Sequence, residues 1–324
     1  MSLTVLTSNL TLHVSTTGSD STGNGTSNNP YASVNKAWEH IKGLWAGEHT
    51  ITVEVAEGIY TTNESITTDS PFGSNVVIEG ETPVTYSDVS DYCRISDLPA
   101  SCSQDTSGYC SYEYFDCTLR LPYGVTASVG QLIEIYDVVN QGSAVRMELL
   151  RGVHQVTDVD DVDTRKVTIR VNVSGILDYD PPTGTIDARI KMYKTMLKYT
   201  GNYEFIEVPG PYHSGTWKNI GFIGDYSDAN TPCVMKLDDG GCGTLEACAI
   251  NFFWAGVRIY GDCTAFLDYT DFSGGIFPIT MKGGVASWRY GVITGLYTNS
   301  GYLDLDESAS LCAGYLEFYG CPHV

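Results

Sequence analysis

Basic residues are scarce in this chain of 324 residues. It holds 18 lysines and arginines against 39 aspartates and glutamates, which gives a formal net charge of −21 at pH 7. A chain with this charge repels phosphate backbones and anionic lipid surfaces, so we expect neither nucleic acid nor a membrane as partner. Acidity is permissive for divalent cations, but it is equally a solubility device. We therefore predict no metal site and no cofactor from it.

Long apolar runs are also missing. No stretch approaches the roughly 20 apolar residues that a membrane-spanning helix needs. Residues 1–7 lack the basic region and the long apolar region of a secretory signal. We expect no membrane insertion and no export through the general secretory pathway, so that the protein reaches its place of action by assembly, by cell lysis or by another route.

Recognised catalytic motifs are absent. The chain contains no Gly-x-Ser-x-Gly, no His-Glu-x-x-His, no Walker loop and no Cys/His triad signature. The glycine-rich loop from Gly18 to Gly25 holds one carboxylate, Asp20, which is too few hard ligands for a calcium loop. These absences exclude several common hydrolase, protease and nucleotidase classes.

The cysteines lack the spacing of a zinc ribbon. None of the ten forms a Cys-x-x-Cys pair. They fall in three groups: Cys93, Cys102, Cys110 and Cys117; Cys233, Cys242, Cys248 and Cys263; and Cys312 and Cys321. The first group is open to disulfide pairing, and the second suits buried thiols in strands. The spacing alone does not assign pairs.

The N-terminal quarter carries the clearest pattern. A short strand at Leu12–Val14 precedes a Gly/Asp/Asn-rich loop, and Ser33 is a good N-cap for the segment that follows. Apolar residues then recur at the 3/4 spacing of an amphipathic helix that Gly47 would end: Val34, Ala37, Trp38, Ile41, Leu44 and Trp45. Alternating strands are expected at Ile51–Val55 and Val76–Gly80.

This order of strand, loop, "NPY", helix, "ITVEVAEGIYT" and "VVIEG" resembles the N-terminal cap of the pectate-lyase-like β-helix superfamily, in which phage tail spikes also fall. The resemblance covers about residues 12–80. It implies an all-β fold, a right-handed parallel β-helix whose open apolar end is plugged by a helix carrying two tryptophans. It is nearly silent on chemistry.

The middle third departs from this pattern. Residues 86–120 show little periodicity and are expected to form a Cys-rich loop or stapled excursion. Alternating strands follow at Gly130–Asp137, Leu149–Val156 and Arg165–Val171, which is typical of antiparallel hairpins in a small barrel or sandwich. We predict an N-terminal unit at 1–85, an inserted antiparallel β domain with this excursion at 86–198, and late β-helix rungs at 199–324.

The last third repeats. Turn-rich points near Gly240–Gly241, Gly261, Gly283–Gly284 and Asp306–Glu307 recur at intervals of about 20 to 23 residues. This interval is the coil length expected for a parallel β-helix. The missing helical periodicity between these points argues against Rossmann-type and TIM-type folds.

Two sets of side chains are candidates for function. Glycan cleavage needs two carboxylates about 5–10 Å apart, which acids about one coil apart satisfy. The acid candidates are Asp238, Asp262 and Asp271. Aromatic faces stack on sugar rings. The candidate glycan-binding residues are Trp254, Tyr260, Trp288 and Tyr290. Chance pairing of acids and packing of aromatics in the core are the competing explanations.

The resemblance and the missing export signal together favour a bacteriophage virion spike or fibre protein that binds a host surface polysaccharide. The resemblance further implies a homotrimer that contacts other virion proteins and is released by host lysis. Two alternatives remain open: a polysaccharide depolymerase on the same scaffold, acting as glycoside hydrolase or lyase, and a purely structural virion component.

Overall fold

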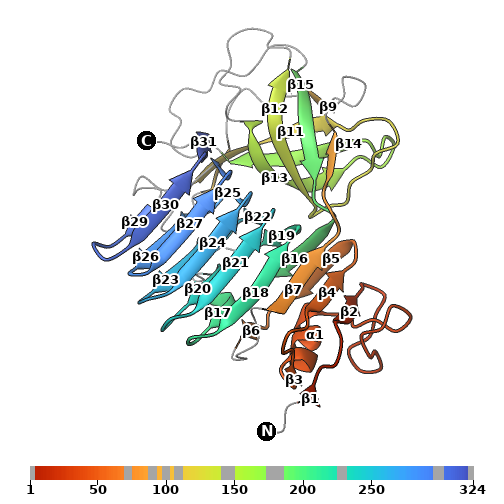
Figure 1. Ribbon diagram of the computed structural model, residues 1–324. Coiled ribbons are helices and arrows are strands. Elements are labelled where there is room, and N and C mark those ends of the chain that lie inside the picture. The colour runs from red at the N-terminus through yellow and green to blue at the C-terminus, as the bar shows by residue number, and fades with distance from the viewer. Residues whose placement is uncertain are drawn as a thin grey trace.

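The computed structural model describes residues 4–68, 75–86, 93–96, 103–105, 112–139, 150–172, 186–224, 232–294 and 303–319. These residues are nearly all strand, with a single α-helix, α1 (Val34–Ile41). The chain winds through about 7 turns of a parallel β-solenoid, to one side of which an antiparallel sheet is attached (Figure 1). The expected fold class, an all-β right-handed parallel β-helix with a capping helix and an inserted antiparallel sheet, is confirmed.

Each coil of the solenoid passes through three parallel sheets in turn. Sheet 1 contains β2 (Leu10–Val14), β4 (Ile51–Val55), β7 (Val76–Gly80), β18 (His213–Lys218), β21 (Cys242–Glu246), β24 (Thr264–Asp268), β27 (Val285–Arg289) and β30 (Ser310–Gly314). Sheet 2 contains β5 (Gly58–Thr62), β16 (Thr195–Tyr199), β19 (Ile220–Ile223), β22 (Ala249–Asn251), β25 (Asp271–Ser273), β28 (Val292–Thr294) and β31 (Glu317–Tyr319). Sheet 3 contains β6 (Ile66–Thr67), β17 (Glu204–Val208), β20 (Cys233–Leu237), β23 (Ala255–Tyr260), β26 (Phe277–Lys282) and β29 (Leu303–Leu305).

The solenoid core forms because alternate side chains of every strand point inward. In sheet 1 the strand register aligns one inward residue of each coil above the next. Those aligned core residues are Leu12, Val53, Ile78, Trp217, Leu245, Leu267 and Trp288, all nearly inaccessible to solvent. The predicted turn points lie between sheets 3 and 1, where Gly240, Gly261, Gly283 and Gly284 adopt the positive φ that glycine tolerates best.

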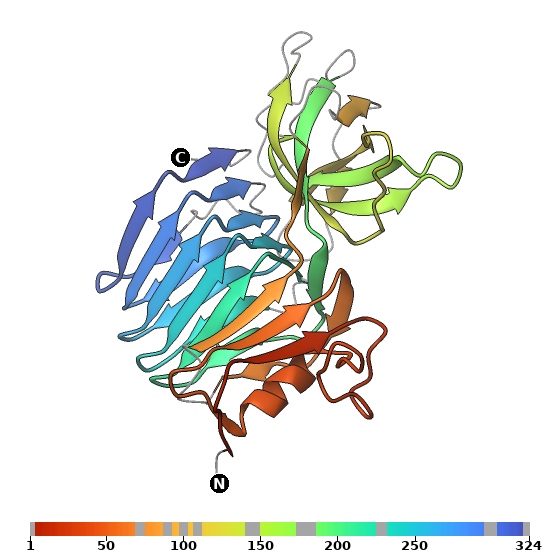
Figure 2. The same ribbon diagram turned by 45° about the vertical axis from the view of Figure 1, so that its right-hand side comes forward.

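Helix α1 covers the N-terminal end of this core (Figure 2). The Ser33 side chain accepts a hydrogen bond from the Lys36 backbone N–H at 3.1 Å, as expected of an N-cap. The helix ends at Ile41, however, earlier than predicted. Leu44 and Trp45 form β3 (Leu44–Trp45), which pairs with β1 (Thr4–Val5), and Trp45 is 45% exposed. Only Trp38 therefore belongs to the plug.

The antiparallel sheet interrupts the solenoid between β7 and β16. Its strands are β8 (Val84–Tyr86), β9 (Cys93–Ser96), β10 (Ser103–Asp105), β11 (Tyr112–Arg120), β12 (Leu132–Val139), β13 (Gly152–Val159), β14 (Lys166–Asn172) and β15 (Ile186–Met192). It has a hydrophobic core of its own, which includes Leu119, Ile133 and Ile169. The expected excursion at 86–120 thus contains a long strand, β11, which pairs with β14. Strand β16, expected within 86–198, pairs with β5 and β19 of the solenoid.

The division of the chain into separate domains stays a prediction. The antiparallel sheet and sheet 2 of the solenoid are in direct contact. The Ser273 hydroxyl of sheet 2 donates a hydrogen bond to the Val153 carbonyl of β13 at 2.5 Å. Gly221 of β19 lies under Leu132, and a Cβ at Gly221 would come within 3.0 Å of the Leu132 side chain. Small residues on this face of sheet 2 therefore let the antiparallel sheet pack closely against it.

The cysteines that the structure describes in full are free thiols: Cys117, Cys233, Cys242, Cys248, Cys263 and Cys312. Burial raises the pKa of Cys233 and Cys248 to about 12, so these thiols pack as small apolar groups. Cys102, Cys110 and Cys321 lie outside the described residues. No helix among the described residues is long and apolar enough to cross a membrane.

Candidate functional site

The outward face of sheet 1 carries one polar side chain on each strand from β2 to β27, always at the same register position. We call this the charged row, and it consists of His13, Glu54, Glu79, Lys218, Glu246, Asp268 and Arg289. Each member follows directly after an inward core residue, so strand alternation directs it to solvent. Neighbouring members lie about 4.8 Å apart along the solenoid because they occupy adjacent parallel strands.

Charges along the row are paired in its C-terminal half. Lys218 Nζ lies 3.2 Å from Glu246 Oε1. Arg289 contacts Asp268 through two hydrogen bonds, Nε to Oδ1 at 2.9 Å and Nη2 to Oδ2 at 2.6 Å. The N-terminal half holds two carboxylates and His13, so the acidic end of the row lies near the cap.

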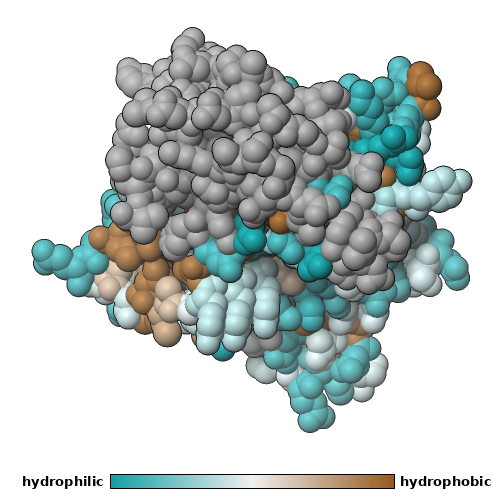
Figure 3. All heavy atoms as spheres, turned by 90° about the horizontal axis from the view of Figure 1, so that it is seen from above, coloured by the Kyte–Doolittle hydropathy of each residue, from teal (hydrophilic) through white to brown (hydrophobic). Residues whose placement is uncertain are grey.

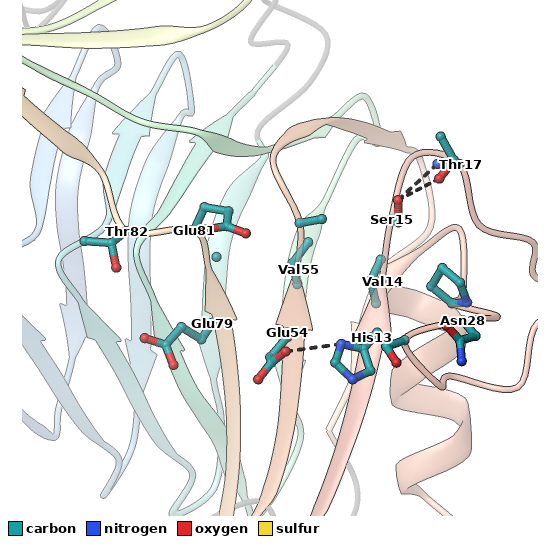
Figure 4. Close-up of a pocket in the computed structure, with 14 residues that line it drawn as sticks. His13, Val14, Ser15, Thr17, Asn28, Glu54, Val55, Glu79, Glu81 and Thr82 are labelled. Carbon is teal, nitrogen blue, oxygen red and sulfur yellow. Dashed lines mark hydrogen bonds and ion pairs between the residues drawn. The ribbon is translucent and has the colours of Figure 1, made fainter.

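A cavity of about 680 Å³ opens at this acidic end. His13, Glu54 and Glu79 line it from the strands, Glu81 lines it just after β7, and Asn28 lines it from the loop that precedes α1. Figure 4 shows the side chains of His13 and Glu54 joined by their ion pair, with Glu79 on the next strand and Glu81 beyond it. The cavity is a polar groove whose ionisable lining is mainly acidic.

Two carboxylates of this groove are held by neighbours of different kinds. His13 Nδ1 lies 3.2 Å from Glu54 Oε2. The Asn219 amide donates a hydrogen bond to Glu79 Oε1 at 3.3 Å. Because Glu54 and Glu79 are register partners on adjacent strands, both sit beside any polymer lying along the row. Carboxylates at this kind of spacing can hydrogen-bond sugar hydroxyls, and they can also serve as acid and base across a glycosidic bond.

A second row begins where sheet 1 turns into sheet 2. Asn219, Ala247, Tyr269, Tyr290 and Tyr315 each follow a strand of sheet 1 and all have φ between 52° and 58°. Their backbones continue the ladder: Asn219 N–H bonds to Glu246 O, Ala247 N–H to Asp268 O, Tyr269 N–H to Arg289 O and Tyr290 N–H to Gly314 O. We call this set the turn row.

Three rings of the turn row form a stack. The centroids of Tyr269 and Tyr290 lie 4.8 Å apart at 11°, and those of Tyr290 and Tyr315 lie 5.2 Å apart at 5°. Their exposed fractions are 54%, 46% and 80% for Tyr269, Tyr290 and Tyr315 respectively. The left-handed backbone is unfavourable for a bulky residue, so repeating it at three tyrosines is an unusual feature of this surface.

Hydrophobic surface gathers on the same side of the molecule as the C-terminal coils. Figure 3 shows brown atoms on the left of the described surface, the side on which Figure 1 places β26, β29 and β30. Exposed apolar side chains of these coils include Val285 and Leu305. The surface of the last coils is therefore aromatic and apolar, in contrast to the acidic groove near the cap.

The acid candidates chosen from the sequence do not meet in one cleft. Asp238 follows β20 and is paired with Lys236, whose Nζ lies 2.8 Å from Asp238 Oδ2. Asp262 is exposed in the turn after β23. Asp271 is buried in sheet 2, under the antiparallel sheet. Their positions do not support a joint role, because Asp271 is on a different sheet and closed to solvent. Catalysis by any one of them stays a prediction.

The aromatic candidates divide between core and surface. Trp288 is 1% exposed, and its indole N–H donates to the Thr270 carbonyl at 3.0 Å inside the solenoid. This position leaves it no face for a sugar, which corrects the expectation. Tyr290 is exposed in the tyrosine stack. Trp254 and Tyr260 are half-buried on the side of sheet 3, where the Arg258 guanidinium lies 4.2 Å above the Trp254 ring.

Sequence reasoning missed Glu54, Glu79 and Tyr315. The signal was present, because the strands of sheet 1 from β2 to β27 repeat an apolar residue followed by an ionisable one, as in Val53–Glu54 and Ile78–Glu79. Aligning the coils on these residue pairs, and not on the glycine turns, would have predicted the charged row. The residues that follow the pairs would then have given the turn row. Among the described residues, no group of three His, Cys, Asp or Glu side chains is placed to hold a metal ion.

A buried polar cluster lies where the antiparallel sheet meets sheet 2. Lys191 Nζ lies 2.5 Å from Glu134 Oε2 and 4.0 Å from Asp271 Oδ2. Burial raises the pKa of Asp271 well above its ordinary value, and the negative charge of Glu134 raises it further. Burial opposes the charge of Lys191, but the two carboxylates outweigh it and raise its pKa. Glu134 and Asp271 are buried and the Lys191 side chain is 22% exposed, so we assign the cluster to docking of the antiparallel sheet on sheet 2.

No family model matches the chain, and no curated protein matches it. Among solved structures, a protein described as a glycoside hydrolase is similar with 9% identity, a TM-score of 0.28 and coverage of 97% of both chains.

Two tailspikes are also similar. The tailspike protein gp49 from Pseudomonas phage LKA1 is 12% identical over 75% of this chain and 55% of its own, with a TM-score of 0.17. The gp54 tailspike of Acinetobacter baumannii bacteriophage AP22, solved in complex with A. baumannii capsular saccharide, is 10% identical over 86% of this chain and 68% of its own, with a TM-score of 0.18. Likenesses this distant assign no activity to the chain.

Proposed function

We propose that this protein is a bacteriophage virion spike or fibre protein that binds a host surface polysaccharide along the outward face of sheet 1. The observation that carries the proposal is the pair of parallel rows on that face, one of charged side chains and one that ends in three stacked exposed tyrosines. A polysaccharide is an extended polymer, and two rows of side chains spaced one coil apart offer it contacts along the length of the solenoid. Carboxylates and tyrosine hydroxyls supply hydrogen bonds, and tyrosine rings supply stacking faces.

The rest of the proposal concerns assembly. A net charge of −21 disfavours nucleic acid as the polymer that lies on this face. A homotrimer in contact with other virion proteins, released to the outside by host lysis, is part of the same proposal. Light scattering coupled to gel filtration measures the oligomeric state directly, and a monomer at micromolar concentration would remove the trimer from it.

A second candidate, a polysaccharide depolymerase, is favoured by one observation. Glu54 and Glu79 lie on adjacent strands at the wall of the groove, the first contacting His13 and the second contacting Asn219. This arrangement gives two carboxylates in different surroundings beside one bound polymer, which is what acid and base roles require.

One experiment separates these functions. Purified protein is applied to an array of bacterial capsular and O-antigen polysaccharides, and the retained polymers are then incubated with it and assayed for new reducing ends and unsaturated uronates. Retention without new ends supports the binder. Release of ends that Glu54→Gln and Glu79→Gln each abolish supports the depolymerase and overturns the non-enzymatic proposal. No retention on the array or on intact cells leaves a purely structural role.

A further inference from the structure

The tyrosine stack ends at Tyr269, and one position of the turn row, Ala247, separates it from Asn219. In the turn row, Ala247 occupies the position before Tyr269, with the same φ of 52° and the same ladder hydrogen bond to the next coil. A methyl group therefore stands where the following three coils each place a ring. Tyr290 is covered on both faces by its neighbours, whereas Tyr269 contacts a ring on one face only in the part of the chain that the structure describes.

We call the space above the Ala247 methyl group, between Asn219 and Tyr269, the step. It is the size of one ring. Positions in the turn row are separated by about 4.8 Å, so Asn219 and Tyr269 stand about 10 Å apart with only the alanine between them. A ring lying parallel to Tyr269 at stacking distance fits this space. The Asn219 side chain is directed to Glu79 and the residue is 6% exposed, so it does not fill the space beside Ala247.

Polar groups border the step on the side of the charged row. Lys218 and Glu246, which precede Asn219 and Ala247, are paired at 3.2 Å. Asp268, which precedes Tyr269, is paired with Arg289. Because each charge has an opposite partner, this part of the surface offers hydrogen bonds without a net charge. The matching ligand is an uncharged ring with one apolar face and hydroxyls at its edge.

We propose that the step at Ala247 is a sugar subsite, in which one neutral pyranose residue of a bound polysaccharide stacks on the open face of Tyr269. The inference rests on the proposed polysaccharide-binding function and names one subsite of it. The subsite continues the tyrosine stack with a ring supplied by the ligand. It also lies between the tyrosine stack and the acidic groove, since the Asn219 backbone N–H bonds to the Glu246 carbonyl and the Asn219 amide bonds to Glu79.

Filling the step tests this directly. Ala247→Tyr places a fourth ring on Tyr269 with a backbone conformation that three neighbouring tyrosines already adopt, so the fold is retained and near-UV circular dichroism reports the added ring. Tyr269→Ala removes the platform. The matched control is Tyr315→Ala, which removes a ring at the far end of the same stack and leaves the step open. The probes are the bacterial polysaccharide array and a panel of neutral oligosaccharides: cellohexaose, maltohexaose, mannohexaose and galactohexaose.

We expect Ala247→Tyr and Tyr269→Ala each to weaken retention of a neutral polymer or hexaose about tenfold, a cost of about 1.4 kcal/mol, while Tyr315→Ala stays within about twofold of the native protein. Native retention that both step variants leave unchanged overturns the subsite and leaves the proposed function intact. Loss in all three variants alike points to the stack as a structural element and also overturns the subsite. Absence of retention by the native protein overturns the proposed function together with the subsite.

Discussion

Lys191 of the antiparallel sheet reaches Asp271 of the solenoid, with Nζ 4.0 Å from Oδ2, although 80 positions separate them in the sequence. Glu134 holds the other side of the same ammonium group. Two acidic side chains thus contact one ammonium group inside the junction, with the Tyr193 ring 4.8 Å from the Lys191 Nζ. The free energy with which the antiparallel sheet docks on sheet 2 therefore depends on the protonation of the acidic side chains in this junction.

Asp271 determines the direction of that sensitivity. Its folded-state pKa is raised well above the ordinary value, first by burial and then by Glu134. The stability that the protonated form contributes is fully present below the unfolded pKa of about 3.9 and is lost as pH rises through the raised folded pKa. Asp271→Asn keeps an oxygen to accept the Val292 N–H and removes this loss. We expect its free energy of unfolding, measured in urea, to fall less above pH 4 than that of the native protein. Parallel curves for the variant and the native protein would contradict this, and Asp262→Asn, an exposed acid, is the control.

His154 acts in the opposite direction. Burial lowers its pKa to about 4, and its ring N–H donates to the Leu150 carbonyl at 2.8 Å. The stability that the neutral ring contributes is present above the unfolded pKa of about 6.5 and is lost as pH falls towards 4, by about 3 kcal/mol in all. We expect His154→Gln, which retains a donor, to show a flatter decrease in urea-measured stability between these pH values. An equal decrease in both proteins would assign the acid sensitivity to other groups.

Trp288 contributes to stability through its burial. The side chain is 1% exposed and its N–H is bonded to Thr270 O, so truncation leaves a large cavity and an unpaired carbonyl. We expect Trp288→Ala to lower the free energy of unfolding by about 3–5 kcal/mol. Tyr203→Ala, at a side chain that is 71% exposed, should change it by less than about 0.5 kcal/mol. Similar effects of the two substitutions would show that Trp288 is not a core residue.

The glycine turns offer a matched pair. Gly284 has φ +77°, and a Cβ there would lie 2.6 Å from the Cys263 carbonyl oxygen and 2.8 Å from that of Gly261. Gly261 has φ +66° and no heavy atom within 4 Å of the same position. Gly261→Ala should therefore cost only the left-handed backbone penalty of about 1 kcal/mol, and Gly284→Ala at least about twice as much. Thermal unfolding of both variants measures the difference, and equal shifts in melting temperature would contradict the steric account.

Much of the fold was predictable from local pattern. The N-cap at Ser33, the alternation in Ile51–Val55 and the glycine turns from Gly240 onward each depend on neighbouring residues in the chain, and the structure contains all three. The long strand β11 was not predicted, because its pairing with β14 joins segments about 50 residues apart in sequence. Pairing across that separation leaves little local periodicity.

The candidate site was less predictable, as Trp288 and Tyr290 illustrate. Both are aromatic residues of the last third of the chain, and the sequence predicted a glycan-binding role for each from that property. Strand β27 ends at Arg289, however, and Tyr290 turns outward at φ 57° while Trp288 points into the core. A shift of one residue in the end of a strand reverses the direction of a side chain, and that end is set by the coil stacked next to it.

Local pattern in the sequence was enough to predict the cap, the alternating strands and the spacing of the coils, because hydrophobic alternation and glycine turns act over a few residues. The tertiary structure alone decided which side chains stand next to one another. Glu54 meets Glu79, and Tyr269 meets Tyr290, only because successive coils stack in one register. That register is set by the packing of the shared core and by the ladder hydrogen bonds between coils, neither of which exists until the chain has wound upon itself.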